Sequence, residues 1–476
     1  MDPMRLDEIA SATQGRLMGG RPETSVSSIS TDTRTLRPGE LFIALVGEQF
    51  DGHTFVAEAF ARGAAAAVLE ATRASGSHEG KPAILVEDTT QALQDIARAS
   101  RERYDCMVVA VTGSNGKTTT KDFIAALVSS ALARPQFTVV KSEGSFNNHV
   151  GVPLTCLEIN RTTGLAVVEI GMSAAGEIRD LAAVAQPQVG VITNVNPAHL
   201  EFFESVAAIA QAKAELLEAL PPDGTAVLNT DDEWVRRIGE RWTGRRITYG
   251  TDPDADVRLS VVRETADGSD VVLECLDGPE LNTVVPTPGR HNAVNAAAAV
   301  AACCAIGMRP EDAVEGFPGL RLPKMRFEQH EWRGARLIND AYNANPASMR
   351  AALATFAAMP GRRRFVVCGD MRELGPHSRQ AHRAIGRLVA EKGFDRVIAT
   401  GGDARHILEA AVEHGLPSDR AADCAGIEEA AALLRDELRP GDAVLIKGSR
   451  ANRMERIVEE LIAAQERGAP RASSCT

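Results

Sequence analysis

Short apolar runs alternate with longer helical patterns through the middle of the chain. Runs of this length and apolarity are typical of strands buried on both faces of a parallel sheet, and the helical segments between them supply the crossovers. The runs are CMVVAVTG, TVVKS, LAVVEIG, VGVITNV and TAVLNTD, at residues 106–113, 138–142, 165–171, 189–195 and 225–231. The pattern predicts a central, doubly wound α/β sheet.

The N-terminal part of the chain has a different mixture of patterns. Short extended runs occur at 39–47 and 83–88, and between them an alanine-rich stretch at 54–73 is expected to be helical. A mixture of this kind predicts a small N-terminal α/β domain.

A different order of strand and helix patterns follows the central runs. Segments 257–264, 270–277 and 281–288 predict an antiparallel meander, and the small residues of 291–307 predict a closely packed helix. Strand signals then resume, each followed by a helical run, at residues 335–340, 363–370, 394–402 and 442–449. This order predicts a Rossmann-like C-terminal domain. No G-x-G-x-x-G follows its first strand, so the order carries no claim about a dinucleotide.

The whole pattern predicts three domains of the α/β class. We expect a small N-terminal domain at residues 1–104 and a central domain with a doubly wound, P-loop ATPase-like sheet at 105–320. A Rossmann-like domain is expected at 321–476.

Composition narrows the function classes. Of 476 residues, 44% are apolar and 24% are charged, so the chain can bury large cores and a disordered chain is excluded. The net charge of -12 disfavours a nucleic-acid scaffold, which needs a basic face. No apolar run approaches a membrane span, and the start lacks the order of a signal peptide, so we expect a cytoplasmic protein. The eight cysteines form no C-x-x-C pair and predict neither a zinc site nor a disulfide framework.

The segment TGSNGKTTTKDF follows the first central strand and predicts a phosphate-binding loop. Its glycines allow a tight turn that points N–H groups at an anion, Lys117 would meet the outer phosphates of ATP, and the Thr118 hydroxyl would bind Mg²⁺. The expected phosphate contacts are Gly113, Ser114, Asn115, Gly116, Lys117, Thr118 and Thr119. The spacing departs from the standard P-loop because Val111 stands where a glycine is usual. The alternative is a structural turn with a surface lysine.

Polar residues at neighbouring strand ends predict a metal site. Glu169 closes one central run, and His199 lies just beyond another. Lys213 falls on the apolar stripe of the helical segment 205–220, so it should face inward, unless it extends along the apolar surface to water. A desolvated, neutral lysine can add CO₂ and become a carbamate anion. The hypothesis is one Mg²⁺ at Thr118 and Glu169 and a second at His199 and carbamylated Lys213, with Mn²⁺ as a possible substitute.

Several polar residues in the second half of the chain are candidates for binding nucleotide and acceptor. Asn292 and Asn295 share a helix face and could bind adenine, although Asn292 could equally cap the helix. Near strand ends of the third domain, residues that could close over ribose and phosphates are Arg326, Asp340 and Lys447. Neutral groups suited to a small polar peptide are Tyr342, Asn343, Asn345 and Ser348. A simple Asn-Pro turn would also explain this last segment.

Together these segments resemble the Mur ligases across nearly the whole chain. Besides the phosphate loop, the similar blocks are ISTDTRTLRPGELFIALVGEQFDGHTF, FNNHVGVPLT, VEIGMSAAGEI, ITNVNPAHLE, AKAEL, GRHNAVNA, INDAYNANPASM, CGDMRELG and LIKGSR. Two of the blocks, DAYNANPASM and GDMRELG, resemble the branch of the family that adds a D-alanyl-D-alanine dipeptide.

The resemblance implies an ATP-dependent ligase of peptidoglycan precursor synthesis. It would join D-alanyl-D-alanine to UDP-N-acetylmuramoyl-tripeptide through an acyl phosphate, with closure of the third domain excluding water. Lys447 would also contact substrate. The UDP-sugar would be bound by the first domain, and the residues implied for the substrate are Thr31, Asp32, Arg34, Gly47, Asn147 and Asn148. These two substrates are the expected partners of a monomer that binds no nucleic acid and does not insert into a membrane.

The chain departs from the family at a few positions, and other functions stay open. Ser145 and Ser173 stand where asparagine is common, His149 replaces an acidic residue, and Met325 replaces a glycine. Rival functions are an amide ligase with another acceptor, including a folylpolyglutamate synthetase-like enzyme, a plain P-loop kinase, and a non-catalytic nucleotide-binding protein.

Overall fold

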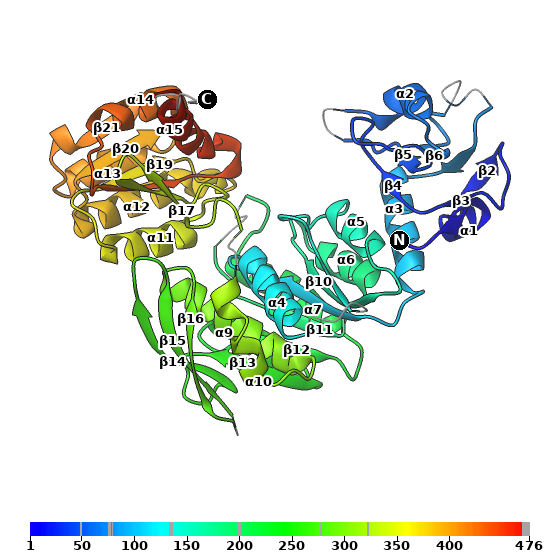
Figure 1. Cartoon of the computed structure of the whole chain (residues 1–476), viewed down its shortest axis with the longest axis horizontal. Helices are drawn as coiled ribbons and strands as arrows, with labels where there is room; N and C mark the ends of the chain where they lie inside the picture. Colours follow the sequence, from blue (N-terminus) through cyan, green and yellow to red (C-terminus); the bar gives the residue numbers. More distant parts are fainter. Residues whose placement is uncertain are drawn as a thin grey trace, which may run out of the picture.

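The computed structural model places three units in an open arc, with the central unit between the other two (Figure 1). The residues that it describes are 1–47, 50–74, 78, 80–132, 137–197, 201–276, 278–320 and 323–468. Each unit is built around its own sheet. In the described part of the chain, no helix is long and apolar enough to cross a membrane.

The N-terminal unit contains a five-stranded sheet in the order β2-β7-β6-β5-β4. Four strands are parallel, and β2 pairs with β7 in the antiparallel direction. The strands are β2 (Arg16–Met18), β4 (Ile29–Ser30), β5 (Leu41–Ile43), β6 (Ala66–Glu70) and β7 (Ala83–Val86). The ribbon of β1 (Met4–Arg5) and β3 (Ser25–Val26) and the helices α1 (Leu6–Ala12), α2 (Val56–Ala61) and α3 (Thr89–Arg101) complete the unit.

The expected helix over 54–73 is wrong in its second half. Helix α2 ends at Ala61, Gly63 adopts a φ of 93°, and the chain then enters β6. A positive φ is cheap for glycine and ends the helix. The residues from Ala66 to Leu69 are fully buried between neighbouring strands, and this burial overrides the helix preference of alanine.

The central unit contains a nine-stranded sheet in the order β16-β15-β14-β13-β12-β11-β8-β10-β9. The five predicted buried strands are confirmed as β8 (Met107–Thr112), β9 (Thr138–Lys141), β10 (Thr163–Glu169), β11 (Val189–Ile192) and β12 (Thr225–Asn229). They are parallel, and the unpredicted strand β13 (Arg245–Gly250) continues them. The predicted meander is also confirmed, as β14 (Val257–Glu264), β15 (Ser269–Cys275) and β16 (Glu280–Val285). It extends the same sheet, because β14 pairs with β13.

Helices cover both faces of the central sheet, as predicted for a doubly wound fold. In β8, Val108 and Ala110 belong to one apolar cluster, and Val109 and Val111 belong to another on the opposite face. The first cluster contains residues of α5 (Gly151–Leu157), α6 (Glu177–Ala185), α7 (Val206–Glu218) and α8 (Glu233–Gly239). The second contains residues of α4 (Lys117–Ala131), α9 (Arg290–Ala305) and α10 (Pro310–Val314).

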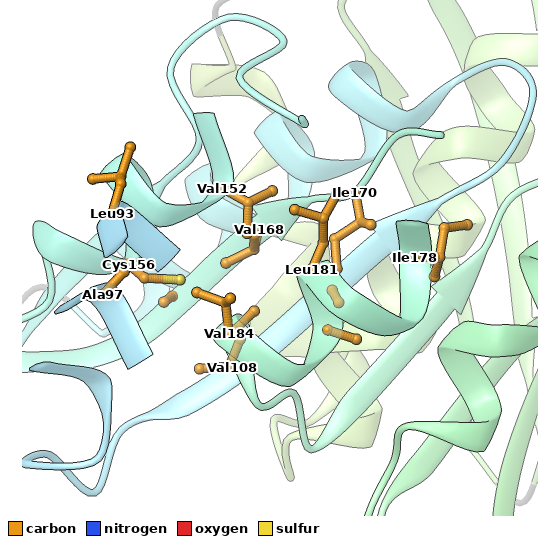
Figure 2. Packing of buried hydrophobic residues seen from close by; sticks show 14 of the residues in the cluster. Leu93, Ala97, Val108, Val152, Cys156, Val168, Ile170, Ile178, Leu181 and Val184 are labelled. Atoms are coloured by element: carbon orange, nitrogen blue, oxygen red, sulfur yellow. The ribbon is translucent and has the colours of Figure 1, made fainter. Parts of the chain in front are cut away.

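Helix α3 joins the N-terminal unit to the central unit. Leu93 and Ala97 of α3 pack beside Val152 and Cys156 of α5 (Figure 2), and all four are fully buried. The two units therefore share one apolar core. The domain limits at 104/105 and 320/321 stay predictions, and the first of them follows directly after this shared helix.

The C-terminal unit contains a six-stranded sheet in the order β17-β18-β22-β19-β20-β21. The four predicted strands are confirmed as β18 (Ala335–Asn339), β19 (Arg364–Gly369), β20 (Arg396–Thr400) and β22 (Ala443–Lys447). The edge strands β17 (Glu328–Trp332) and β21 (Ala421–Cys424) were not predicted. The helices are α11 (Pro346–Ala358), α12 (Ser378–Lys392), α13 (Arg405–Glu413), α14 (Ile427–Glu437) and α15 (Glu455–Gly468).

Candidate functional site

A cavity of about 530 Å³ lies between the central and C-terminal units. Most of the predicted site residues line it, and they come from strand ends and loops of both units. They are Ser114, Asn115, Gly116, Lys117, Thr118, Thr119, Asn147, Asn148, Glu169, Lys213, Asn292, Asn295, Arg326, Asp340, Tyr342, Asn343, Asn345, Ser348 and Lys447. The structure thus gathers residues that are far apart in the sequence around one space large enough for a nucleotide and part of a substrate.

A few predicted residues are not in this lining. Thr31, Asp32, Arg34 and Gly47 lie in the N-terminal unit, where the Asp32 carboxylate pairs with the Arg34 guanidinium at 2.6 Å. Their role in binding the UDP-sugar stays a prediction. His199 lies outside the described residues, and its assignment to the metal site also stays a prediction.

The phosphate loop connects β8 to α4 and requires glycine at two positions. Gly113 has a φ of 146°, and a Cβ there would lie 1.9 Å from the Thr193 hydroxyl oxygen. Gly116 has a φ of 83°, and a Cβ there would lie 2.4 Å from Asn295 Oδ1. A side chain at either position would therefore clash with the wall that the loop packs against.

Two of the loop N–H groups do not point at an anion, contrary to what the sequence predicted for this loop. The Ser114 amide donates to the Asn194 carbonyl, and the Asn115 amide donates to Asn194 Oδ1, each at 2.9 Å. These two N–H groups hold the loop to the end of β11 and do not point at a ligand. The positive end of helix α4, which begins at Lys117, is therefore the part of this region that suits an anion.

Lys117 is the first residue of this helix. Its ammonium group donates to the Gly113 carbonyl at 2.7 Å and lines the cavity. Burial lowers the pKa of Lys117, and the nearby Glu169 carboxylate opposes part of that shift. The cation is thus held beside the loop, where it could contact a terminal phosphate.

Thr118 and Glu169 form a connected cluster of oxygen atoms. The Thr118 hydroxyl donates to Glu169 Oε2 at 2.8 Å, and Asn147 Nδ2 donates to Glu169 Oε1 at the same distance. Glu169 is 1% exposed. Hydroxyl and carboxylate oxygens side by side are the ligand types that Mg²⁺ prefers.

Lys213 is buried, as the apolar stripe of its helix predicts. Its side chain is 2% exposed and lines the cavity from α7, so it does not extend to bulk water. Burial, with a smaller contribution from Lys117, places the pKa of Lys213 well below its usual value. Among the described residues, none accepts a hydrogen bond from its Nζ. A lowered pKa favours the neutral amine, which is the form that can react with CO₂.

The C-terminal unit reaches the phosphate loop through polar side chains. Arg326 Nη2 donates to the Thr118 hydroxyl at 2.7 Å, and its guanidinium lies over the Tyr342 ring, 4.1 Å from the ring centroid. The Tyr342 hydroxyl is hydrogen-bonded to Ser145, one of the positions that depart from the family pattern. The two units are therefore in direct contact at the cavity.

Two residues of the 340–349 segment act as helix caps. Asn345 Oδ1 accepts from the Ser348 amide at 2.9 Å, and the Ser348 hydroxyl accepts from the Asn345 amide, which together cap α11. The turn explanation is thus realised for these two. Asn345 Nδ2 also donates to Asn115 Oδ1 at 2.7 Å, so the same residue contacts the phosphate loop.

The remaining predicted residues are engaged within the protein. Lys447 pairs with Asp340 at 2.7 Å and also donates to the Asn343 carbonyl at 3.0 Å. Asn292 does not cap α9, whose N-cap is Gly289. Instead Asn292 Nδ2 donates to the Pro288 carbonyl at 2.9 Å. Asp340, Lys447 and Asn292 retain atoms in the cavity lining.

The cavity also contains residues that we did not predict. His291 precedes Asn292 in the GRHNAVNA block, and burial lowers its pKa to about 4. Arg372 and Glu373 come from the GDMRELG block. Both blocks carried the family resemblance, so the blocks themselves were the signal that could have identified these side chains.

Three Mur ligase family models match successive parts of the chain. Family models described as "Mur ligase family, catalytic domain", "Mur ligase middle domain" and "Mur ligase, glutamate ligase domain" match residues 25–101, 111–303 and 325–450. A Bacillus subtilis protein named UDP-N-acetylmuramoyl-tripeptide–D-alanyl-D-alanine ligase is 38% identical over 457 residues. The alignment covers 95% of this chain and 97% of the relative.

Solved structures of MurF enzymes are similar to this chain over most of its length. MurF from Acinetobacter baumannii superimposes with a TM-score of 0.86 at 31% identity, covering 97% of this chain and 99% of that one. MurF ligase from Thermotoga maritima, solved in complex with ADP, superimposes with a TM-score of 0.79 at 27% identity. That match covers 93% of this chain and 98% of the other.

Proposed function

The chain belongs to the Mur ligase family, and on this premise we propose that it joins D-alanyl-D-alanine to UDP-N-acetylmuramoyl-tripeptide at the expense of ATP. The product is a precursor of peptidoglycan. The observation that carries the proposal is the convergence, around one cavity, of the phosphate loop, the Thr118–Glu169 oxygen pair, Lys213 and the C-terminal segment with Tyr342. A plain P-loop kinase would need neither the buried Lys213 nor the third unit.

The reaction requires activation of a carboxylate, because a carboxylate is a poor electrophile. The terminal carboxylate of the tripeptide attacks the γ-phosphate of ATP, and an acyl phosphate and ADP form. Lys117 and the positive end of α4 offset the charge that develops on the phosphoryl oxygens. The neutral amine of the dipeptide then attacks the acyl carbon and a tetrahedral intermediate forms. The carbon–oxygen bond to the phosphoryl group breaks, and inorganic phosphate leaves with the proton that the amine gives up.

The C-terminal unit separates these steps from water. Its contacts with the phosphate loop, Arg326 with Thr118 and Asn345 with Asn115, hold the third unit against the site of phosphoryl transfer. An acyl phosphate is hydrolysed readily, so exclusion of water favours aminolysis by the acceptor.

Mg²⁺ is the metal that the oxygen cluster suits. Thr118 and Glu169 would hold one ion with the ATP phosphates, and His199 with carbamylated Lys213 would hold a second, for which Mn²⁺ could substitute. The desolvated amine of Lys213, beside the cavity, is the observation that supports the carbamate. Bound metal would supply charge neutralisation between the two anionic reactants.

Isotope transfer tests the proposed function. With ¹⁸O in the terminal carboxylate of the UDP-tripeptide, one label should appear in inorganic phosphate for each product formed, and the product mass should equal tripeptide plus dipeptide less water. Unlabelled phosphate would contradict the acyl phosphate. Parallel reactions with single amino acids in place of D-alanyl-D-alanine would reveal an amide ligase with another acceptor. ATP binding without release of phosphate would indicate a non-catalytic protein.

The proposed function also carries an expectation about the cellular location and the oligomeric state. We expect the enzyme to act as a monomer in the cytoplasm, where UDP-linked precursors and ATP are available, with no nucleic-acid partner.

A further inference from the structure

The loop after β19, residues 370–375, presents an arginine to the cavity from a fixed backbone. The Met371 amide donates to His382 Nε2 at 2.9 Å, and the Arg372 amide donates to the Ser449 hydroxyl at 2.9 Å. The Ser449 amide in turn donates to the Asp370 carbonyl at 3.0 Å. His382 is fully buried, so this part of the loop is anchored to the interior of the C-terminal unit.

The Arg372 side chain, in contrast, is largely open. It is 61% exposed and lines the cavity. One Asp370 carboxylate oxygen lies 3.3 Å from Arg372 Nη2, while the other accepts from the Asp403 and Ala404 amides. The carboxylate is thus fixed by the backbone, and most of the five N–H donors of the guanidinium remain available to a ligand.

The other cations of the cavity have assigned contacts or roles. Lys117 lies on the phosphate loop, Arg326 is bonded to Thr118, and Lys447 is paired with Asp340. Lys213 belongs to the proposed metal site. Arg372 is therefore the cation of the described lining that has neither a role in the proposed reaction nor a side-chain contact shorter than 3.3 Å.

The loop that carries Arg372 contacts both units that line the cavity. The Glu201 amide of the central unit donates to the Glu373 carbonyl at 3.3 Å, so the loop bridges the two units beside the cavity. Leu374, which is 2% exposed, packs its side chain into the core of the C-terminal unit. A ligand held by Arg372 would therefore contact the C-terminal unit, from which Tyr342 and Asn343 line the same cavity.

We propose that Arg372 binds the terminal carboxylate of the D-alanyl-D-alanine acceptor. This inference rests on the proposed function. A planar guanidinium can hold a carboxylate through two parallel hydrogen bonds, which fixes the orientation of a small ligand as well as its position. Anchoring the carboxyl end leaves the amine, at the other end of the dipeptide, free to reach the acyl phosphate. The same contact would select a dipeptide with a free carboxylate over one that lacks it.

A comparison of two acceptors in two variants tests the anchor. The acceptors are D-alanyl-D-alanine and D-alanyl-D-alaninamide, which differ in the terminal charge alone, and the variants are Arg372→Met and Arg372→Lys. Wild type should prefer the carboxylate in kcat/KM by about 10- to 100-fold, the range of a charge-assisted hydrogen-bonded pair. Arg372→Met should lose this preference through a higher KM for D-alanyl-D-alanine. Arg372→Lys should recover part of it.

The controls distinguish binding of the acceptor carboxylate from a general effect on the enzyme. In Arg372→Met the KM for ATP and the KM for the UDP-tripeptide should change by less than about 2-fold. The contact that is lost involves the acceptor dipeptide and neither of these two substrates. Arg456→Met is the matched control, because Arg456 is 46% exposed, pairs with Glu428 on the surface and does not line the cavity. Its kinetics should equal wild type.

Two outcomes overturn the inference, and a third refutes the function on which it rests. Equal loss for both acceptors in Arg372→Met would show that the residue supports the loop and does not bind the carboxylate. Wild-type kinetics in Arg372→Met would place the carboxylate elsewhere. Absence of turnover with D-alanyl-D-alanine in wild type would instead refute the proposed function itself.

Discussion

Arg326 Nη2 of the C-terminal unit donates a hydrogen bond of 2.7 Å to the Thr118 hydroxyl of the phosphate loop, across 208 positions of sequence. The same guanidinium lies over the Tyr342 ring. The hydroxyl expected to contact metal is thus also the point at which the third unit touches the loop. Nucleotide binding and the position of the C-terminal unit are therefore linked through one side chain.

Arg326→Ala should weaken this link. Loss of a charge-assisted hydrogen bond corresponds to about 10- to 100-fold in an equilibrium constant, so we expect kcat to fall by about that factor. Small-angle scattering of the ATP-bound variant should give a larger radius of gyration than wild type. An unchanged kcat together with an unchanged radius would show that Arg326 does not hold the units together.

Lys117→Ala should abolish turnover, with a fall in kcat of at least about 10²- to 10³-fold, because the charge that faces the transferred phosphoryl group is removed. Steady-state release of phosphate is the measurement. Lys81→Ala, which changes an exposed lysine of the N-terminal unit, should retain full activity. Substantial turnover in Lys117→Ala would remove this residue from the phosphoryl-transfer step.

Lys213→Ala should be inactive but partly restored by acetate or propionate. A short carboxylic acid can enter the space left by the side chain and replace the carbamate as an anionic ligand. Activity as a function of acid concentration should saturate, whereas Lys117→Ala should show no such rescue. With ¹³C-labelled bicarbonate, wild type should give a carbamate signal that Lys213→Ala lacks, and a missing signal in wild type would contradict the modification.

Lys121→Met should affect binding of the UDP-tripeptide more than binding of ATP. The fully buried Lys121 ammonium donates to the Ser142 and Gly144 carbonyls at 2.6 and 2.7 Å, at the start of the loop that carries Asn147. Each carbonyl left without a donor costs about 1–3 kcal/mol in the free energy of unfolding.

Kinetics and urea unfolding check both parts of this prediction. The matched control is Lys141→Met. Lys141 is 48% exposed and pairs with Asp122. The Asp122 carboxylate also lies 3.5 Å from the Lys121 ammonium, so both lysines contact the same acidic residue. Lys141→Met should change the binding of the UDP-tripeptide and the free energy of unfolding only slightly. Equal effects of the two substitutions would argue against a specific role of the buried amine.

His291 should make the folded state less stable in acid. Burial lowers its pKa from 6.5 to about 4, so between these values the unfolded chain binds the proton more tightly than the folded one. Stability is complete above about pH 6.5, falls as the pH is lowered, and is reduced by about 3 kcal/mol once the pH is below about 4. His291→Gln should show a shallower decline between pH 7 and pH 5 in urea unfolding. Identical declines in the two proteins would refute the assignment.

The local patterns predicted the elements well where burial on both faces is continuous. The strands β8, β10, β11 and β12 and the helix α9 follow from apolar runs and small residues, because such signals reside in neighbouring positions. The phosphate loop was predictable for the same reason, since two glycines, a lysine and a threonine lie within a few residues. Strands β13, β17 and β21 were missed because polar residues interrupt their apolar patterns.

What the sequence determined by itself is therefore the set of local elements, the family blocks and the chemical types of the site residues. The tertiary structure alone decided that the 66–70 segment is a strand, that Arg326 meets Thr118, that the Ser114 and Asn115 amides are used within the protein, and that Arg372 opens into the cavity. The physical reason is that periodicity reports which face of an element is buried, whereas the partner that buries it depends on the packing of segments that are not neighbours in the sequence.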